Sequence, residues 1–282
     1  MSAEPVIEHR DIDAGDGLSI HVASSGASQP LILLHGFTGS SATWNYLRSR
    51  LDSSHRVIAI DLPGHGRSSS PLDASRYSLD RLADDLVTVL DALDLTRVAL
   101  FGYSMGGRAA LRFAIRHPDR LTALILESTS PGIEDQQRRS ERIAADNALA
   151  ELIEKSGIEA FVSKWEQLPI WESQAALPED IRRTLRTQRL LNEPRGLANS
   201  LRGAGAGVDP DVLNQLHLIA APTLLLAGEL DSPYVAFARR LQSGLPHAEV
   251  QLIPKAGHAA HLENPDAVID AVADFLRRQP VP

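Results

Sequence analysis

Short, almost uninterrupted apolar runs alternate with helical patterns along most of the chain. Six of these runs predict strands, at residues 31–35, 57–60, 98–103, 121–127, 223–228 and 249–253. Strands of a parallel sheet are buried on both faces, and they therefore read as continuous apolar segments. A hairpin around residues 6–10 and 18–23 is expected to add antiparallel edge strands. The pattern predicts an α/β fold with a mostly parallel central sheet of about eight strands flanked by helices.

The segments between the strands carry helical signals. Apolar residues from Leu79 to Leu93 fall on one face at helical spacing, and Ser78 is placed to cap that helix. Residues 104–117 predict a second helix that ends before Pro118. Residues 265–278 predict the last one, with Pro265 in its first turn.

The stretch between residues 131 and 208 differs from the rest of the chain because it contains helical patterns but no strand candidate. It is bounded by Ser130-Pro131-Gly132 and by a glycine-rich run at 203–207. We therefore expect a helical cap over residues 131–208, inserted before the last two strands. The core would then comprise residues 1–130 and 209–282.

Composition narrows the class of protein. The formal net charge of −8 argues against a nucleic-acid partner, because binding to phosphates requires a basic surface. The absence of cysteine excludes disulfides, a thiolate nucleophile and a cysteine-ligated metal. No apolar run approaches the roughly 18 residues of a membrane span. The N-terminal stretch, MSAEPVIEHRDIDAG, is polar and acidic, unlike a signal peptide. We expect a cytoplasmic protein that does not bind membranes.

The run Gly102-Tyr103-Ser104-Met105-Gly106 is a G-x-S-x-G pattern between a predicted strand and a predicted helix. A turn this tight strains the serine backbone and projects its hydroxyl above the strand ends. The helix N-terminus also places free N–H groups beside the hydroxyl. Ser104 is therefore the candidate reactive serine.

A reactive serine requires a base and an acid that orients the base, and in this fold class they follow in the order acid, then histidine. Asp231 and Glu229 both follow the strand at 223–228, and Asp231 has the usual G-x-x-D placement. His258 follows the last strand, at the carboxyl edge of the sheet, and His261 is its rival. We expect Asp231 and His258 to complete the triad.

Two main-chain N–H groups would form an oxyanion hole. One belongs to Met105, the residue after the serine, and the other to Phe37 in the loop His35-Gly36-Phe37. The glycine-rich loop at 61–68, DLPGHGRS, has neither a phosphate-binding nor a dinucleotide-binding pattern, and is expected to be a structural turn. No histidine–carboxylate cluster has the spacing of a metal site.

Together these residues resemble the α/β-hydrolase superfamily over the whole chain. A narrower resemblance is to the 2-succinyl-6-hydroxy-2,4-cyclohexadiene-1-carboxylate synthases of menaquinone biosynthesis. It is carried by GYSMGGR at 102–108, ESTSPGI at 127–133, RIAAD at 142–146, PRGLANSLR at 194–202 and AGHAAHLENP at 256–265. The first of these segments contains Arg108. An ordinary esterase needs no cation at this position.

The resemblance implies a lyase that eliminates pyruvate from 2-succinyl-5-enolpyruvyl-6-hydroxy-3-cyclohexene-1-carboxylate. In such a reaction Ser104, activated by the triad, acts as the base that removes a ring proton, and no acyl-enzyme forms. The resemblance implies neither a metal nor an organic cofactor. The only partner that it implies is a small-molecule polycarboxylate, and the number of subunits stays open.

The family resemblance also implies a substrate-binding set. Arg108, Arg142 and Arg189 would bind the substrate's carboxylates, for which the planar guanidinium is suited. Tyr103 and Trp165 would line the pocket. The segment 171–185 is longer than the family's usual spacing, and Arg186 is therefore an alternative to Arg189.

Two other functional classes are compatible with the fold. A carboxylesterase or a C–C bond hydrolase would use Ser104 of the same triad as a nucleophile. A non-enzymatic binding protein would be expected to lack one triad member, whereas this chain has candidates for all three. Arg108 and the arginines of the cap favour a polycarboxylate over a neutral ester.

Overall fold

A computed structural model describes residues 6–279 of the 282-residue chain. The strands are β1 Glu8–Asp13, β2 Ser19–Ser25, β3 Gln29–Leu34, β4 His55–Ile60, β5 Val98–Tyr103, β6 Leu121–Glu127, β7 Thr223–Gly228 and β8 Ala248–Ile253. The α-helices are α1 Asn45–Leu51, α2 Leu79–Ala92, α3 Met105–Arg116, α4 Gln136–Trp165, α5 Glu179–Leu190, α6 Pro194–Ala204, α7 Ser232–Gly244, α8 Ala260–Glu263 and α9 Pro265–Arg277. Short 3₁₀ helices span η1 Ser41–Trp44, η2 Ala74–Tyr77, η3 Pro118–Arg120, η4 Pro169–Ala176 and η5 Leu213–Leu218.

All eight strands form one sheet, in the order β1-β2-β4-β3-β5-β6-β7-β8. The hairpin strands β1 and β2 are antiparallel, and β2 also pairs antiparallel with β4. Every other pairing is parallel, as the continuous apolar runs predict. The predicted mostly parallel sheet of about eight strands is therefore confirmed.

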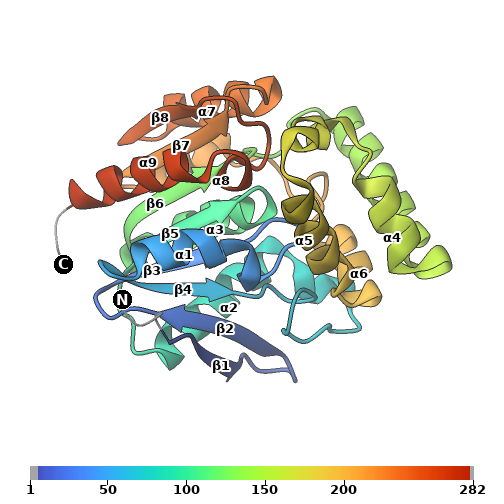
Figure 1. The fold of residues 1–282 in the computed structure, drawn as a ribbon, viewed down its shortest axis with the longest axis horizontal. Coiled ribbons are helices and arrows are strands. Elements are labelled where there is room, and N and C mark those ends of the chain that lie inside the picture. The colour runs from blue at the N-terminus through green and yellow to red at the C-terminus, as the bar shows by residue number, and fades with distance from the viewer. Residues whose placement is uncertain (1–5, 280–282) are drawn as a thin grey trace.

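Two helical layers cover the sheet (Figure 1). Alternate residues of β3 pack against the two helical layers in turn. Leu31 and Leu33 pack with α1 and α9 on one face, whereas Ile32 and Leu34 pack with α2, α3 and α7 on the other. Each of these four side chains is fully buried. Burial on both faces is why these strands lack polar positions.

Between β6 and β7 the described chain forms only helices and loops. Figure 1 shows α4, α5 and α6 gathered on one side of the core. Helices α4 and α6 enclose an apolar cluster of their own, which includes Ile153, Phe161 and Leu197. Helix α4 bends at Gly157, whose φ of 81° is not helical. Among residues 6–279, no helix has the length and apolar character needed to cross a membrane.

The loop after β4 is a structural turn built around the carboxylate of Asp61. This carboxylate accepts hydrogen bonds from the main-chain N–H groups of Ser41, at 2.5 Å, and Arg67, at 2.8 Å. Gly66 has a φ of 53°, and a Cβ at this position would overlap the Asp61 carboxylate. The turn therefore requires glycine for two independent reasons.

The substitution Gly66→Ala is expected to lower the free energy of unfolding by about 2–4 kcal/mol. The left-handed backbone costs a residue with a Cβ about 1–2 kcal/mol, and displacement of Asp61 adds to this cost. Urea unfolding at equilibrium would measure the loss. Gly15→Ala is the matched control, because Gly15 has a φ of 80° but a methyl group added there would meet no atom within 4 Å. If the two variants lost equal stability, the contact with Asp61 would have no energetic role.

Candidate active site

Ser104 sits at the turn from β5 into α3, with a φ of 51° and a ψ of −109°. A non-glycine residue in this region of backbone space is strained. The flanking glycines make the turn possible, because a Cβ on Gly102 would overlap the carbonyl group of Gly106, and one on Gly106 would overlap that of Leu34. Helix α3 can thus lie directly against the sheet, and Ser104 stands at the carboxyl edge.

His258 and Asp231 lie beside this serine. The Nε2 atom of His258 is 3.0 Å from the Oγ atom of Ser104, and its Nδ1 atom is 2.8 Å from an Asp231 oxygen. Because a carboxylate accepts, Nδ1 carries the hydrogen and Nε2 is left to accept the serine proton. Asp231 and His258 are 8% and 2% exposed, so bulk water competes little for these contacts. This arrangement can activate a hydroxyl group.

The rival residues lie elsewhere. His261 pairs through Nδ1 with Glu127, at 2.8 Å, and is buried away from the serine hydroxyl. Glu229 is exposed on the surface. His35 also has a supporting role: its Nδ1 atom donates to the carbonyl group of Gly36, and its Nε2 atom accepts from the N–H of Leu62. Burial lowers the pKa of His35, so this ring stays neutral and holds the loop that carries Phe37.

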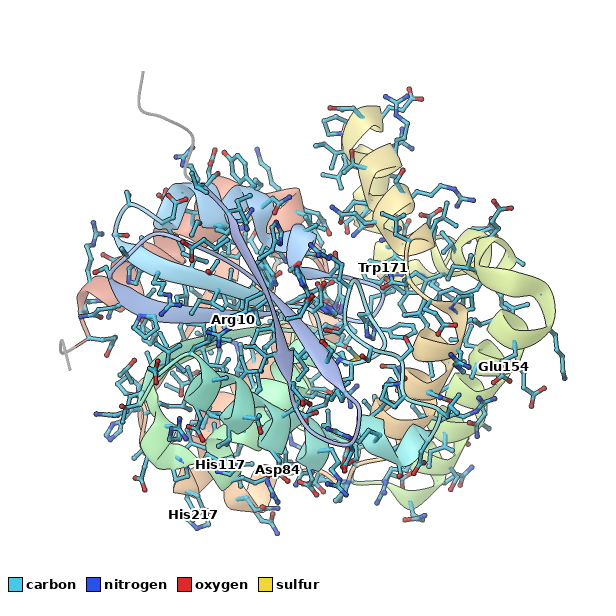
Figure 2. The ribbon with its side chains drawn as sticks, turned by 90° about the horizontal axis from the view of Figure 1, so that it is seen from below. Arg10, Asp84, His117, Glu154, Trp171 and His217 are labelled. Atoms are coloured by element: carbon cyan, nitrogen blue, oxygen red, sulfur yellow. The ribbon has the colours of Figure 1, made fainter. Side chains whose placement is uncertain are left out.

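A cavity of about 100 Å³ opens above Ser104. Figure 2 shows Trp171 at the junction between the core and the helices of residues 131–208, where this cavity lies. The lining side chains come from both parts of the chain. They include Phe37, Tyr103, Ser104, Met105, Arg108, Arg142, Trp165, Trp171, Tyr234 and His258. Both residues expected to donate the oxyanion-hole N–H groups thus border the cavity.

Arg108 is the arginine that follows Ser104 in the turn from β5 into α3. Its own N–H donates to the carbonyl group of Ser104, at 3.0 Å, one helical turn away. Its guanidinium donates to the carbonyl groups of Ala204, at 2.6 Å, and Gly205, at 3.4 Å, at the end of α6. Burial lowers the pKa of Arg108, opposed by Asp209, although an arginine stays charged at neutral pH. A partly buried cation therefore borders the cavity beside Ser104.

Arg142 reaches the same cavity from α4. Its Nε atom donates to both carboxylate oxygens of Asp146, at 2.9 and 3.0 Å. Burial raises the pKa of Asp146, whereas Arg142 favours its charged form. Because the side chain of Arg142 remains 44% exposed, its other N–H donors are accessible to a ligand.

The structure does not bring Arg189 or its alternative Arg186 into this cavity. Both side chains extend from α5 to Glu166, at 2.9 and 2.5 Å respectively. Arg189 also donates to Gln174 and lies over the ring of Trp171, with its Cζ atom 5.4 Å from the ring centroid. In this arrangement an ion pair with Glu166 holds the guanidinium of Arg189 over the ring of Trp171, and its expected contact with the substrate stays a prediction.

Two aromatic residues that the sequence did not single out contact the histidine of the triad. The rings of Tyr234 and Trp171 meet His258 edge-on, with centroid separations of 4.4 and 5.5 Å. Tyr234 lies three residues after Asp231, on the first turn of α7. Its spacing from the expected acid could have identified it in the sequence. Trp171 had no comparable signal, because the position of η4 at the site depends on how residues 131–208 fold. Both rings shield His258 from water.

Tyr103 and Trp165 line the cavity as expected. Burial, reinforced by the charge of Glu127, raises the pKa of Tyr103 well above its usual value, so this phenol remains protonated. Trp165 packs edge-on against Phe37, with ring centroids 5.3 Å apart. Within the described residues 6–279, no group of histidine, aspartate and glutamate side chains has the arrangement of a metal site.

Comparison with known proteins agrees with this geometry. The family model for the alpha/beta hydrolase fold matches residues 29–265. A Bacillus subtilis protein provisionally named 2-succinyl-6-hydroxy-2,4-cyclohexadiene-1-carboxylate synthase is 44% identical over 268 residues. The match covers 94% of this chain and 97% of the relative.

Solved structures similar to this chain indicate the same fold and family. MenH from S. aureus superposes with a TM-score of 0.85 at 39% identity, over 88% of this chain and 93% of its own. A thermophilic esterase from Thermogutta terrifontis superposes with a TM-score of 0.84 at 27% identity, over 96% and 98% of the two chains. The chain therefore belongs to the α/β-hydrolase fold family and, within it, to the family of 2-succinyl-6-hydroxy-2,4-cyclohexadiene-1-carboxylate synthases.

Proposed function

We propose that this chain is a carbon–oxygen lyase of menaquinone biosynthesis. It would eliminate pyruvate from 2-succinyl-5-enolpyruvyl-6-hydroxy-3-cyclohexene-1-carboxylate to give 2-succinyl-6-hydroxy-2,4-cyclohexadiene-1-carboxylate. The observation that carries the proposal is the partly buried guanidinium of Arg108 in the cavity of a serine that lies within reach of a histidine base. The name of the Bacillus subtilis relative, at 44% identity over nearly the whole chain, supports the same reaction. The expected cytoplasmic location and the absence of a nucleic-acid partner stay predictions.

In the proposed reaction the triad transfers protons and forms no covalent intermediate. Ser104 gives its proton to Nε2 of His258 and removes the ring proton next to the succinyl ketone. The electrons move through the ring double bond, the carbon–oxygen bond to the enolpyruvyl group breaks, and pyruvate leaves as its enolate. The His258 imidazolium, stabilised by Asp231, returns a proton to that enolate. A positioned base of this kind contributes roughly 10²- to 10⁴-fold to a rate.

The negative charge in this step develops on the oxygen of the succinyl ketone. The main-chain N–H groups of Phe37 and Met105 are the proposed donors to that oxygen, since both residues border the cavity. Preorganised donors of this kind cost no reorganisation when the charge forms. The Met105 N–H also belongs to the first turn of α3, where the helix dipole favours negative charge.

Residues 131–208 are proposed to act as a cap that supplies part of the binding site. Arg142 and Trp165 would contact the substrate together with Tyr103 and Arg108, each arginine binding a carboxylate. The cavity of about 100 Å³ is smaller than the roughly 300–1,000 Å³ typical of ligand sites, so the cap must move outward to admit the substrate. Arg189 and its partner Glu166 both belong to residues 131–208, and a role of Arg189 in binding a carboxylate stays part of the proposal.

A pyruvate-release assay tests the proposed reaction. The enolpyruvyl substrate is generated in situ by the preceding enzyme, and the rate is compared with its slow spontaneous decay. A short-chain nitrophenyl ester is supplied in parallel. Fast pyruvate release with poor ester turnover is the expected result. Brisk ester cleavage without faster pyruvate release would assign the protein to the carboxylesterases instead.

Ser104→Ala is expected to lower pyruvate release by about 10²- to 10⁴-fold, because it removes the proposed base. The same variant should lose all ester turnover. Both rates are measured with protein whose thermal unfolding matches that of the wild type. Ester cleavage that survived the substitution would show that another group is the nucleophile.

Arg108→Ala is expected to reduce kcat/KM for pyruvate release by roughly 10- to 100-fold, because a hydrogen bond to a charged group contributes about 1.5–3 kcal/mol. Turnover of the neutral nitrophenyl ester should change much less. Arg116→Ala is the matched control, since Arg116 lies on the same helix but pairs with Asp84 on the surface. If the turnover of the ester and that of the polycarboxylate fell equally, Arg108 would have no specific role in binding carboxylates.

A further inference from the structure

Glu127 is a buried carboxylate that the proposed reaction does not use. It is the last residue of β6 and is fully buried. Its Oε1 atom accepts two hydrogen bonds from His261, one from the main-chain N–H at 3.1 Å and one from Nδ1 of the ring at 2.8 Å. A buried carboxylate is costly unless it is hydrogen-bonded, and among the described residues Oε2 has no partner, so the two bonds to Oε1 stabilise Glu127 in its buried position.

The main chain of Glu127 is bonded to the serine turn. Its carbonyl group accepts the N–H of Ser104, at 2.9 Å, and the hydroxyl group of Thr129, at 3.1 Å. Glu127 also faces Tyr103 in the parallel pairing of β5 with β6. The hydrogen bond from Ser104 therefore fixes the strained residue that carries the reactive hydroxyl group.

His261 anchors the loop that carries His258. It lies three residues further along, in α8, which Figure 1 shows on the side of the core that faces α5. The ring of His261 is enclosed between Trp44 and Tyr103, with centroid separations of 4.7 and 4.5 Å. The carboxylate of Glu263 closes the loop itself by accepting the N–H of Gly257, at 2.7 Å.

Glu127 thus bonds through its main chain to Ser104 and through its side chain to His261, which lies three residues after His258. We propose that Glu127 and His261 are positioning residues that set the 3.0 Å separation between Ser104 Oγ and His258 Nε2. This inference goes beyond the proposed reaction, because it concerns activation of the serine with any substrate. A misplacement of about 1 Å far from the reacting atoms can lower a rate 10²-fold.

The readout is the second-order rate constant for labelling of Ser104 by a fluorophosphonate, together with kcat and KM. Labelling reports on the serine–histidine contact even if pyruvate elimination is the wrong reaction. All rates are measured at a temperature where circular dichroism shows each variant fully folded. A role in folding alone would leave these rates unchanged in the folded protein.

His261→Phe keeps an aromatic ring but removes the ring donor to Glu127 and leaves only the main-chain N–H. Labelling and kcat are expected to fall by about 10- to 100-fold, with KM changed less than about threefold. His261→Asn places an amide N–H near the position of Nδ1, and it should retain most of the labelling rate. Glu127→Gln keeps the shape and the accepting oxygen, so it too should stay close to the wild type.

His21→Phe is the matched control. His21 is also a buried histidine whose Nδ1 atom pairs with a carboxylate, that of Asp11 at 2.6 Å, but it lies in β2, away from the serine. The variant His21→Phe should be less stable than the wild type, but its Ser104 should be labelled at the same rate. The proposal is overturned if folded His261→Phe labels within twofold of the wild type, or if His21→Phe loses as much. If His261→Phe does not fold, a slow rate in both His261→Asn and Glu127→Gln would overturn it as well.

Discussion

The tight turn between β5 and α3 is the constraint on which the site depends. Helix α3 approaches the sheet so closely that a Cβ on Gly102 or Gly106 would overlap main-chain atoms. The residue between them, Ser104, is consequently forced into a left-handed backbone. Strain of this kind persists only where the surroundings hold the residue from several sides. Here the carbonyl group of Glu127 holds its N–H, and the N–H of Arg108 holds its carbonyl group.

The same turn explains how the sheet and its helices contact residues 131–208. Arg108 follows Ser104 by one helical turn, so its guanidinium reaches the last carbonyl groups of α6. A cation at a helix C-terminus is favoured by the helix dipole, which offsets part of the cost of burying it. A guanidinium has five N–H donors, and those not used by α6 can bind a carboxylate. Contact with the end of α6 and the proposed recognition of substrate thus depend on one side chain.

Much of the fold could be predicted because its signals are local. Continuous apolar runs identified the parallel strands, and the serine turn and the two later loops followed from their places after those strands. The side chains of residues 131–208 were harder to place, since their direction depends on contacts far apart in the sequence. Arg189 has the charge expected of a carboxylate ligand, but Glu166, 23 residues earlier, holds it in an ion pair. The contacts of Trp171 with His258 depend on the path of η4, and no local pattern encodes it.

Two histidines three residues apart each pair with a carboxylate, and their surroundings decide what each pair does. His258 with Asp231 and His261 with Glu127 have the same Nδ1–carboxylate distance of 2.8 Å. The Nε2 atom of His258 faces a serine hydroxyl and a cavity, whereas the ring of His261 lies between Trp44 and Tyr103. A base must exchange its proton with a ligand, and His258 borders the cavity that Ser104 also lines. His261 borders a smaller cavity of about 40 Å³ that Ser104 does not line. The hydrogen bonds of the second pair therefore act on the positions of the atoms around it.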